Sequence, residues 1–157
     1  MRIFVAYASE DRQIAEQLYF VLAGAGHDVF FDKARLPSGS DFNQCIFAEI
    51  GRSDVLIFLI SPSSLEKGNY ALTELRYAQE KWAHPKGHVL PVVIRPVSWD
   101  RIPSYLTAVS VIEPEGNVPA EVAHAVRSLT SGEASLSASV VVGTTNIVRL
   151  NLIRQER

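Results

Sequence analysis

One carboxylate and one aromatic side chain, spaced a helical turn apart, are the best candidates for chemistry in this sequence. Tyr70 and Glu74 stand four residues apart, so their side chains lie on one face if the segment is helical. At about 100° per residue, the apolar side chains of this segment form one stripe, which consists of Ala71, Leu75, Ala78 and Trp82. Glu74 borders that stripe and is therefore half-sheltered. A carboxylate in such a place can bind sugar hydroxyls and stabilise a cationic carbon centre, as in glycoside cleavage.

The same two positions also have a structural explanation. Glu74 can be a boundary residue of its helix that pairs with Lys81 or Arg76, and Tyr70 can be an aromatic cap over the preceding loop. Position on the helix alone favours the structural explanation for Glu74. A functional role for this carboxylate therefore needs support from other parts of the chain.

A polar loop after the second apolar run contains further candidates. It spans residues 32–40, which is longer than the roughly two to six residues usual between a strand and a helix. Arg35 can bind two phosphate oxygens at once through its guanidinium, although a solvated surface arginine has the same pattern. Asp32 can bind a sugar hydroxyl or accept hydrogen bonds from the loop's own N–H groups. Leu36 and Phe42 are typical of side chains that anchor such a loop.

The exit of the first apolar run, at Ala8 and Ser9, is another place where a ligand can approach. Both side chains are small, and N–H groups at the start of a helix bind anions. Ser9 can instead be the N-cap of the following helix, with Glu10 and Asp11 favoured by the helix dipole. The sequence favours the capping role for Ser9.

These candidates need a scaffold, and the apolar pattern predicts an alternation of strands and helices. Five apolar runs are typical of buried strands, at residues 3–7, 29–31, 54–60, 89–94 and 109–112. Four segments have helical spacing, at residues 14–25, 42–50 with a stop at Gly51, 70–82 and 119–129. Such alternation predicts a parallel sheet with helices on both sides. Ligands of such sheets bind beyond the carboxyl ends of the strands, where the candidate residues lie.

Composition and motifs exclude several other classes of function. With a net charge of −2 and 47% hydrophobic residues, the chain has no basic excess for binding nucleic acid. The single cysteine, Cys45, forms no internal disulfide and fits a reducing compartment. No apolar run is long enough to span a membrane and no signal peptide is evident, so we expect a cytoplasmic protein. The histidines lack metal-ligand spacing, and phosphate-binding glycine motifs are missing.

Four motifs, in the order and spacing found here, resemble those of Toll/interleukin receptor (TIR) domains. The first is residues 4–11, in the form seen in bacterial members. The second is Phe31-Asp32-x-x-x-Leu36-x-x-Gly39-x-x-Phe42, which covers the segment called the BB loop. The third is the apolar run at 53–62, and the fourth is Tyr70-x-x-x-Glu74-Leu75. The resemblance covers residues 1–130.

This resemblance implies a flavodoxin-like, three-layer α/β sandwich with a central, mostly parallel sheet of five strands. It also implies one of two functions. Some TIR domains are signalling modules that act by assembling, and others are enzymes that cleave NAD+ at the nicotinamide–ribose bond. The enzymes release nicotinamide and form ADP-ribose or a cyclic ADP-ribose, and many bacterial members are linked to anti-phage defence.

For this chain the resemblance favours the enzyme, an NAD+ nucleosidase with NAD+ as its substrate and no cofactor. It implies that Glu74 is the catalytic carboxylate. It also implies that the substrate contacts the residues around the strand exits, which are Tyr7, Ala8, Ser9, Asp32, Arg35, Leu36 and Tyr70. Enzymatic members often carry tryptophan at the position of Tyr70, and tyrosine keeps a flat aromatic surface there. Because nicotinamide leaves as a neutral molecule, one carboxylate suffices where sugar leaving groups need two.

The resemblance further implies activity that depends on self-association through the 32–42 loop, with a sensor domain or subunit as a further partner. The alternative is a non-catalytic module whose loop docks onto other TIR domains. A receiver domain is disfavoured, because it needs a phosphoacceptor aspartate after the third strand, where this chain has Ser61-Pro62.

The last part of the chain, residues 131–157, has a different character. Residues 131–139 are small and polar, as in a linker, and residues 140–153 have the pattern of a β-hairpin. Two strands alone are marginally stable in water. The tail therefore packs on the domain, pairs with another chain or begins a second domain, and the sequence leaves these alternatives open.

Overall fold

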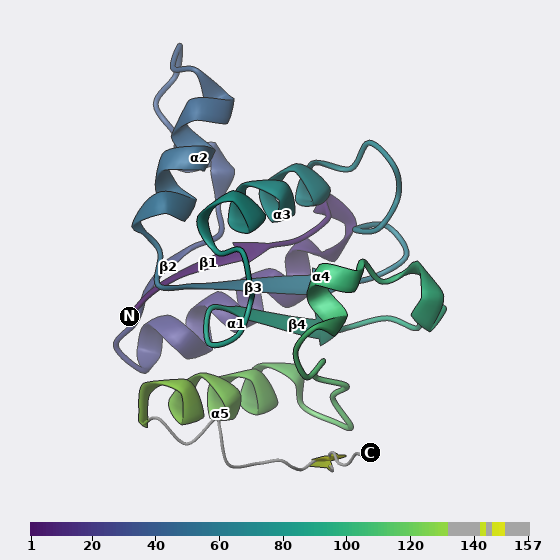
Figure 1. Ribbon diagram of the computed structural model, residues 1–157. Coiled ribbons are helices and arrows are strands. Elements are labelled where there is room, and N and C mark those ends of the chain that lie inside the picture. Colours follow the sequence, from purple (N-terminus) through teal and green to yellow (C-terminus); the bar gives the residue numbers. More distant parts are fainter. Residues whose placement is uncertain (132–141, 144–145, 150–157) are drawn as a thin grey trace. The chain divides into compact units, whose positions relative to one another are not determined.

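The computed structural model describes residues 1–131, 142–143 and 146–149 (Figure 1). The chain divides into two compact units, Met1–Ala120 and a second unit that begins at Glu121. The first unit contains the parallel sheet and every candidate residue named above. No helix in the described part of the chain is long and apolar enough to cross a membrane.

The sheet of the first unit has four parallel strands, β1 (Arg2–Ala6), β2 (Asp28–Phe30), β3 (Val55–Ile60) and β4 (Val89–Val93). Their order is β2-β1-β3-β4, so β1 and β3 lie in the middle. Every residue of β3 is buried, as expected for a strand without polar alternation. The parallel α/β architecture predicted from the sequence is confirmed.

The expected fifth strand at 109–112 is wrong, because only one isolated bridge, between Val92 and Ile112, forms there. Ile112 donates its N–H to Pro91 O at 2.8 Å, and Val93 donates to Ile112 O at 2.9 Å. The next parallel hydrogen bonds on either side need N–H groups from Pro91 and Pro114, and proline has none. Pro91 is tolerated within β4 for the same reason, since its nitrogen faces this outer edge.

Helices α1 (Arg12–Gly24), α2 (Phe42–Arg52) and α3 (Tyr70–Lys81) connect the strands, and α4 (Ser104–Thr107) follows β4. Helix α5 (Val118–Ser131) begins at the boundary of the two units. Side chains cap three of these helices: Asp41 accepts a hydrogen bond from Gln44 N, Asn69 accepts one from Ala71 N, and Asn117 accepts one from Ala120 N at the start of α5. The expected stop at Gly51 is wrong by one residue, since α2 continues to Arg52.

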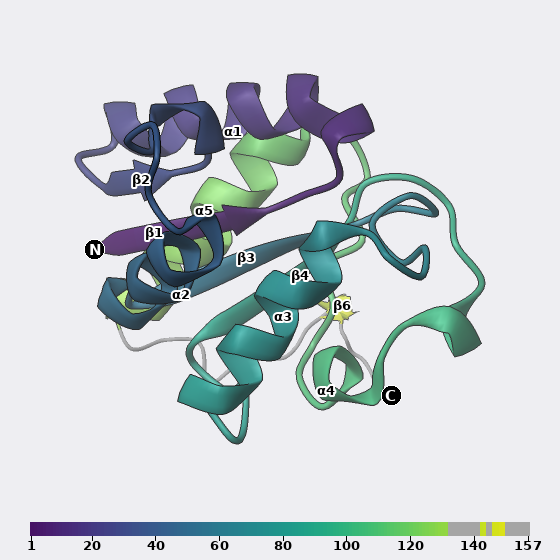
Figure 2. The same cartoon turned by 90° about the horizontal axis from the view of Figure 1, so that it is seen from above.

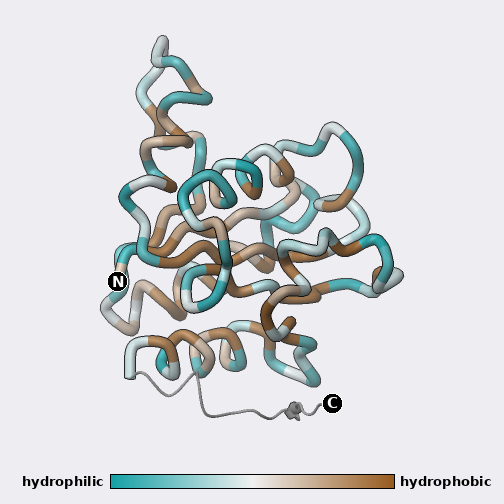
Figure 3. The backbone as a smooth tube through the Cα atoms, viewed as in Figure 1, coloured by the Kyte–Doolittle hydropathy of each residue, from teal (hydrophilic) through white to brown (hydrophobic). Residues whose placement is uncertain are grey.

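Helices cover both faces of the sheet within the first unit. Helices α2 and α3 lie on one face and α1 lies on the other (Figure 2). The strands in between are the most hydrophobic segments of the unit (Figure 3). Alternate strand residues point to α2 and α3 and form a core with them, which includes Phe4, Leu56, Phe58, Ile46, Ile50, Leu75 and Ala78.

The tail contains two short strands, β5 (Val142–Gly143) and β6 (Asn146–Arg149), which pair antiparallel. They fall within the region where the sequence predicts a hairpin. The linker expected at 131–139 and the end of the second expected strand, residues 150–153, lie outside the described residues, Ser131 excepted.

Candidate functional site

The candidate residues meet at the carboxyl edge of the sheet, where the chain changes direction. From β1 the chain goes outward to β2, returns past β1 to β3 and continues to β4. Right-handed crossovers then place α1 on one face and α2 and α3 on the other. The crevice at such a switch point, between β1 and β3, is where open α/β sheets bind ligands.

Glu74 is fully buried at this edge, with 0% of its side chain exposed. Among the described residues its only ion-pair partner is Lys33, whose Nζ lies 3.2 Å from Oε2. No described residue forms a well-aligned hydrogen bond with either carboxylate oxygen. The carboxylate is thus more enclosed than the half-sheltered position expected from the helix pattern.

Neither partner considered for Glu74 in a structural role pairs with it. Lys81 Nζ donates to the carbonyl oxygens of Gly51 and Ser53, at 2.7 and 2.5 Å, and so caps the end of α2. Arg76 lies over the ring of Tyr77, at 5.8 Å from its centroid. Glu74 is therefore not the boundary residue paired along its own helix that the alternative describes.

Burial changes the protonation of Glu74. It raises the pKa of the carboxyl from 4.5 to about 7, while the ammonium of Lys33 acts in the opposite direction. Both the neutral and the ionised carboxyl are then populated near neutral pH. Strongly perturbed carboxyl groups at a sheet edge are typical of functional sites, because folding alone gives no reason to bury one.

Lys33 brings the loop after β2 onto this carboxylate. It lies in a short 3₁₀ turn, Lys33–Arg35, and its Nζ is also 4.3 Å from the centroid of the Tyr7 ring. The ammonium therefore lies against both an aromatic face and a carboxylate. Sequence reasoning missed Lys33, since a lysine within a polar loop carries no signal for a buried partner far along the chain.

Tyr7 links the exits of β1 and β2. Its hydroxyl donates to Phe31 O at 2.9 Å and accepts from Arg12 Nη1 at 3.3 Å. Burial raises the pKa of Tyr7, so its hydroxyl remains protonated and available as a donor. Arg12 also pairs with Asp32, with Nη2 3.5 Å from Oδ2. The wall of the site next to Glu74 is thus held by three side chains.

The other loop candidates have different environments. Asp32 accepts a hydrogen bond from Ala34 N at 3.1 Å, so its capping role is observed. Leu36 is partly buried against the core and anchors the loop. Arg35 is exposed and takes part in none of the ion pairs formed by the described residues.

Tyr70 connects α3 to α2. Its hydroxyl donates to Asn43 Oδ1 at 2.6 Å, and its ring meets the ring of Phe42 edge to face, with centroids 5.2 Å apart. Burial is the main reason that the pKa of Tyr70 rises to about 12. Its electrostatic interaction with Glu74 places the two side chains near each other, as their spacing predicts.

Ala8 and Ser9 form the turn from β1 into a short 3₁₀ helix, Ser9–Asp11. Ala8 is fully buried, whereas Ser9 is exposed and its Oγ lies 3.3 Å from Glu10 Oε1. The side chain of Ser9 caps neither this turn nor α1, so the capping role favoured for it is wrong.

A second buried carboxylate, Asp11, lies at the same edge and was not identified as such from the sequence. It is 1% exposed; its Oδ2 accepts from Ser61 Oγ at 2.5 Å and its Oδ1 from Arg95 Nε at 2.7 Å. Ser61 Oγ in turn accepts from Ser64 N at 3.1 Å. This network joins the exits of β1, β3 and β4.

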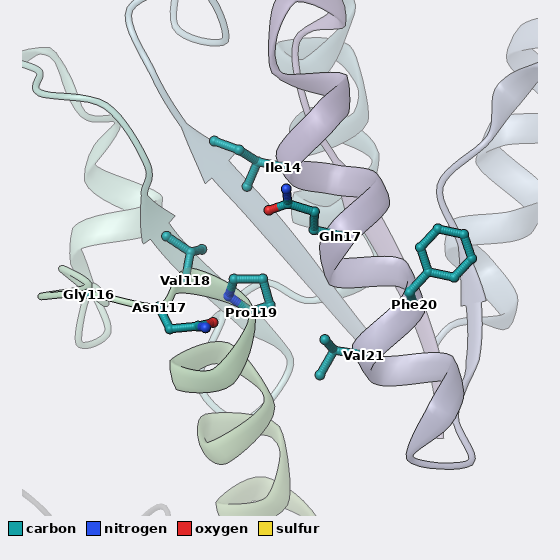
Figure 4. Close-up of a pocket in the computed structure, with 8 residues that line it drawn as sticks. All are labelled: Ile14, Gln17, Phe20, Val21, Gly116, Asn117, Val118 and Pro119. Atoms are coloured by element: carbon teal, nitrogen blue, oxygen red, sulfur yellow. The ribbon is translucent and has the colours of Figure 1, made fainter.

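Two hollows of the first unit are lined by residues other than Glu74, Lys33 and Tyr7. The larger of the two, of about 550 Å³, is formed by α1, the turn before α5 and the first two residues of α5 (Figure 4). None of its lining residues has a titratable side chain; they are Ile14, Gln17, Phe20, Val21, Gly116, Asn117, Val118 and Pro119. A second hollow of about 330 Å³ includes Arg95 but no side chain of the Glu74 cluster. The described residues contain no group of three or more metal-ligating side chains.

Solved structures show what this fold is similar to. It resembles the TIR domain of the Toll-related receptor TRR-2 from Hydra magnipapillata, with a TM-score of 0.64, 23% identity, and coverage of 82% of this chain and 97% of that one. A metazoan TIR-STING receptor from C. gigas has a TM-score of 0.64 and 18% identity, with 82% of this chain and 40% of that one covered.

The TIR domains of the activated Roq1 resistosome give a TM-score of 0.55 at 19% identity, with 91% and 89% of the two chains covered. At these identities the similarity shows the fold alone. No curated protein matches the chain. The family model for the TIR domain, however, matches residues 3–129, which is most of the sequence. The chain therefore belongs to the TIR domain family.

Proposed function

We propose that this TIR domain is an NAD+ nucleosidase and that Glu74 is its catalytic carboxylate. The observation that carries the proposal is the burial of Glu74 without a well-aligned hydrogen bond from any described residue, at the sheet edge where α/β folds bind ligands. A buried, poorly satisfied carboxylate destabilises the fold. Its presence is accounted for if it acts on a substrate.

The chemistry needs one carboxylate and no metal. The bond between ribose C1′ and the nicotinamide nitrogen breaks, and its electron pair goes to the ring, which leaves as neutral nicotinamide. The ribose becomes cationic at C1′, and Glu74 can bind its hydroxyls and stabilise that charge. Water then adds to C1′ and loses a proton, which gives ADP-ribose. Attack by a nucleophile of the same molecule instead gives a cyclic ADP-ribose.

The surrounding residues have assignable parts in this proposal. Lys33 contacts both the ring of Tyr7 and the carboxylate of Glu74. Tyr70 lies one helical turn before Glu74 on α3. The exposed guanidinium of Arg35 is free to bind the diphosphate. Small side chains at Ala8 and Ser9 leave room for the nucleotide. Asp32 shapes the loop by accepting a hydrogen bond from one of its N–H groups, and Leu36 does so by packing against the core.

Self-association and a role in bacterial anti-phage defence are the finer parts of the proposal. The Roq1 structure, whose TIR domains resemble this chain, is that of an activated resistosome. In this chain the 32–42 loop is largely exposed, and its last residue, Phe42, presents an apolar ring. An exposed aromatic at the end of an exposed loop is a suitable contact for a second copy.

Incubation with NAD+ tests the proposal. The chain at high concentration should release nicotinamide, and chromatography should identify ADP-ribose or a cyclic form as the second product. The same incubation after dilution tests the dependence on self-association, since turnover per molecule should fall. Absence of turnover even in a forced oligomer would favour the alternative.

The alternative is a non-catalytic module that signals by docking onto other TIR domains. The exposed Phe42 and Phe47 on α2 favour it, because both present apolar surface on the same helix. It leaves the burial of Glu74 without an explanation.

A further inference from the structure

The position of Lys33 suggests how the site is occupied before a ligand arrives. Its ammonium lies 3.2 Å from Glu74 Oε2 and 4.3 Å from the centroid of the Tyr7 ring. A carboxylate and an aromatic face are the two groups that proteins use to bind an organic cation. Lys33, from the loop after β2, thus occupies a cation site built by two other segments, the exit of β1 and α3.

We propose that Lys33 is an internal inhibitor of this site: its ammonium occupies the cation site formed by Glu74 and Tyr7, and a positively charged ligand must displace it. The inference rests on the proposed function in naming the nicotinamide ring of NAD+ as the displacing cation. It adds a competitor that the chain itself supplies.

Of this pair, Lys33 is the side chain that an approaching ligand meets first. Glu74 is 0% exposed, whereas the side chain of Lys33 is 21% exposed, so the lysine is the member of the pair that reaches solvent. Lys33 is carried by a single 3₁₀ turn, and a lysine side chain has several rotatable bonds. Lys33 can therefore leave by rotating outward, while Glu74 is fixed on α3.

Charge balance favours an exchange of one cation for another. An ionised Glu74 without any cation is an isolated buried charge, which is strongly unfavourable. The oxidised nicotinamide ring carries the positive charge that replaces Lys33, and the reduced ring carries none. We therefore expect the site to bind oxidised dinucleotide and other pyridinium cations in preference to neutral analogues.

Few other groups act on Glu74 electrostatically. Lys33 lowers the pKa of Glu74, and Tyr7 at the end of β1 and Tyr70 on α3 also interact with Glu74 electrostatically. Both are tyrosines whose pKa is raised by burial, so they stay neutral around pH 8. Removal of the Lys33 charge should therefore change the pKa of Glu74 more than any other substitution of a neighbouring side chain.

The test uses Lys33→Ala, with Lys67→Ala as a matched control, because Lys67 is an exposed lysine outside the site. The probe is the 1-methylnicotinamide cation, which allows binding to be measured without turnover. The measurement is made at pH 9. Lys33→Ala should bind the probe more tightly than the parent, on the order of tenfold, the size of one charge-assisted hydrogen bond. Lys33→Arg should bind it like the parent, because it restores a cation at the same place.

A second readout is the NMR titration of the Glu74 carboxyl carbon. Its midpoint should move to higher pH in Lys33→Ala and stay unchanged in Lys67→Ala, because loss of the Lys33 cation disfavours the ionised form. Unchanged probe affinity or an unchanged midpoint in Lys33→Ala would overturn the inference.

The outcomes also separate this inference from the proposed function. If the parent and Lys33→Ala both fail to cleave NAD+ while probe binding and the midpoint change as expected, the nucleosidase proposal fails and the role of Lys33 stands. If the parent cleaves NAD+ but Lys33→Ala has the same KM for NAD+ and the same affinity for the probe, the nucleosidase proposal stands and the role of Lys33 is wrong.

Discussion

Two buried carboxylates lie at the same edge of the sheet, and their surroundings differ. Asp11 is 1% exposed and accepts hydrogen bonds from Ser61 and Arg95 at 2.5 and 2.7 Å. Glu74 is 0% exposed, and in the part of the chain that the structure describes its only charged contact is Lys33, without a well-aligned hydrogen bond. The first carboxylate is fully satisfied within the protein, and the second is not.

The difference in their partners distinguishes a carboxylate that stabilises the fold from one that does not. A buried charge stabilises a fold only when its partners replace the water that it has lost, and the network of Asp11 does so for three strand exits. Glu74 lacks such partners, and its carboxyl has a pKa near neutral pH as a consequence. An unsatisfied buried group in a native protein needs an explanation, and a bound ligand that completes its contacts is the simplest one.

The largest effect on stability should come from Asp11→Ala. It removes the acceptor of two hydrogen bonds, one of them to a charged group, and leaves the Ser61 hydroxyl buried without its acceptor. We expect the free energy of unfolding to fall by roughly 4 kcal/mol, measured by urea denaturation. Because Arg95 is 51% exposed, solvent compensates the lost ion pair in part, and a larger loss is not expected. A change below about 1 kcal/mol would show that this network is not structural.

Glu74→Gln should raise the free energy of unfolding at alkaline pH, whereas Asp11→Ala lowers it. The pKa of Glu74 rises on folding from 4.5 to about 7, so the fold is favoured below pH 4.5 and this contribution is lost as pH rises through 7. At pH 8 the neutral variant should be more stable than the parent by roughly 3 kcal/mol, and near pH 4 the two should be equal. Urea denaturation at both pH values measures this. Glu80→Gln, on the exposed side of the same helix, is the control and should change neither value.

Ser61→Ala tests the network of Asp11 from its other end. The variant loses the hydrogen bond to Asp11 and the acceptor for Ser64 N, both within the buried interior. We expect a loss of roughly 2 kcal/mol in the free energy of unfolding, measured by urea denaturation. If Ser61→Ala proved as stable as the parent, the contrast between the two carboxylates would lose its basis.

Lys33→Ala should give the smallest effect and one that depends on pH. At pH 5 the folded chain carries a neutral Glu74, so loss of the lysine costs little. At pH 8 the ionised carboxylate has lost its cation, and the free energy of unfolding should fall by about 1 kcal/mol. Denaturation at the two pH values measures the difference, with Lys67→Ala as the reference. Equal losses at pH 5 and pH 8 would mean that the pair does not act through charge.

The sequence predicts the scaffold better than the contacts that satisfy the carboxylates. Apolar runs locate the four strands, and helical spacing places Tyr70 and Glu74 on one side of α3. The fifth strand was not predictable from its apolar pattern, since two prolines on different segments remove its hydrogen bonds. The TIR motifs identify Glu74 as a candidate, but its role as a catalytic group stays a prediction.

The partners of a buried charge can lie far away in the sequence, so the residues next to that charge do not predict them. Arg95 reaches Asp11 across 84 residues, and the sequence near Asp11 is equally consistent with an exposed acid at a helix start. Lys33 likewise belongs to a polar loop whose other residues are mostly exposed. Only the packing of the four strands and α3 brings these groups together.

Nicotinamide release by Glu74→Gln at high protein concentration tests the central claim most directly. The variant keeps the shape of the side chain and removes its charge, and Glu80→Gln controls for the substitution itself. We expect Glu80→Gln to match the parent and Glu74→Gln to be slower by on the order of a hundredfold to a thousandfold. Release by Glu74→Gln at the rate of the parent would contradict the assignment of this carboxylate as catalytic.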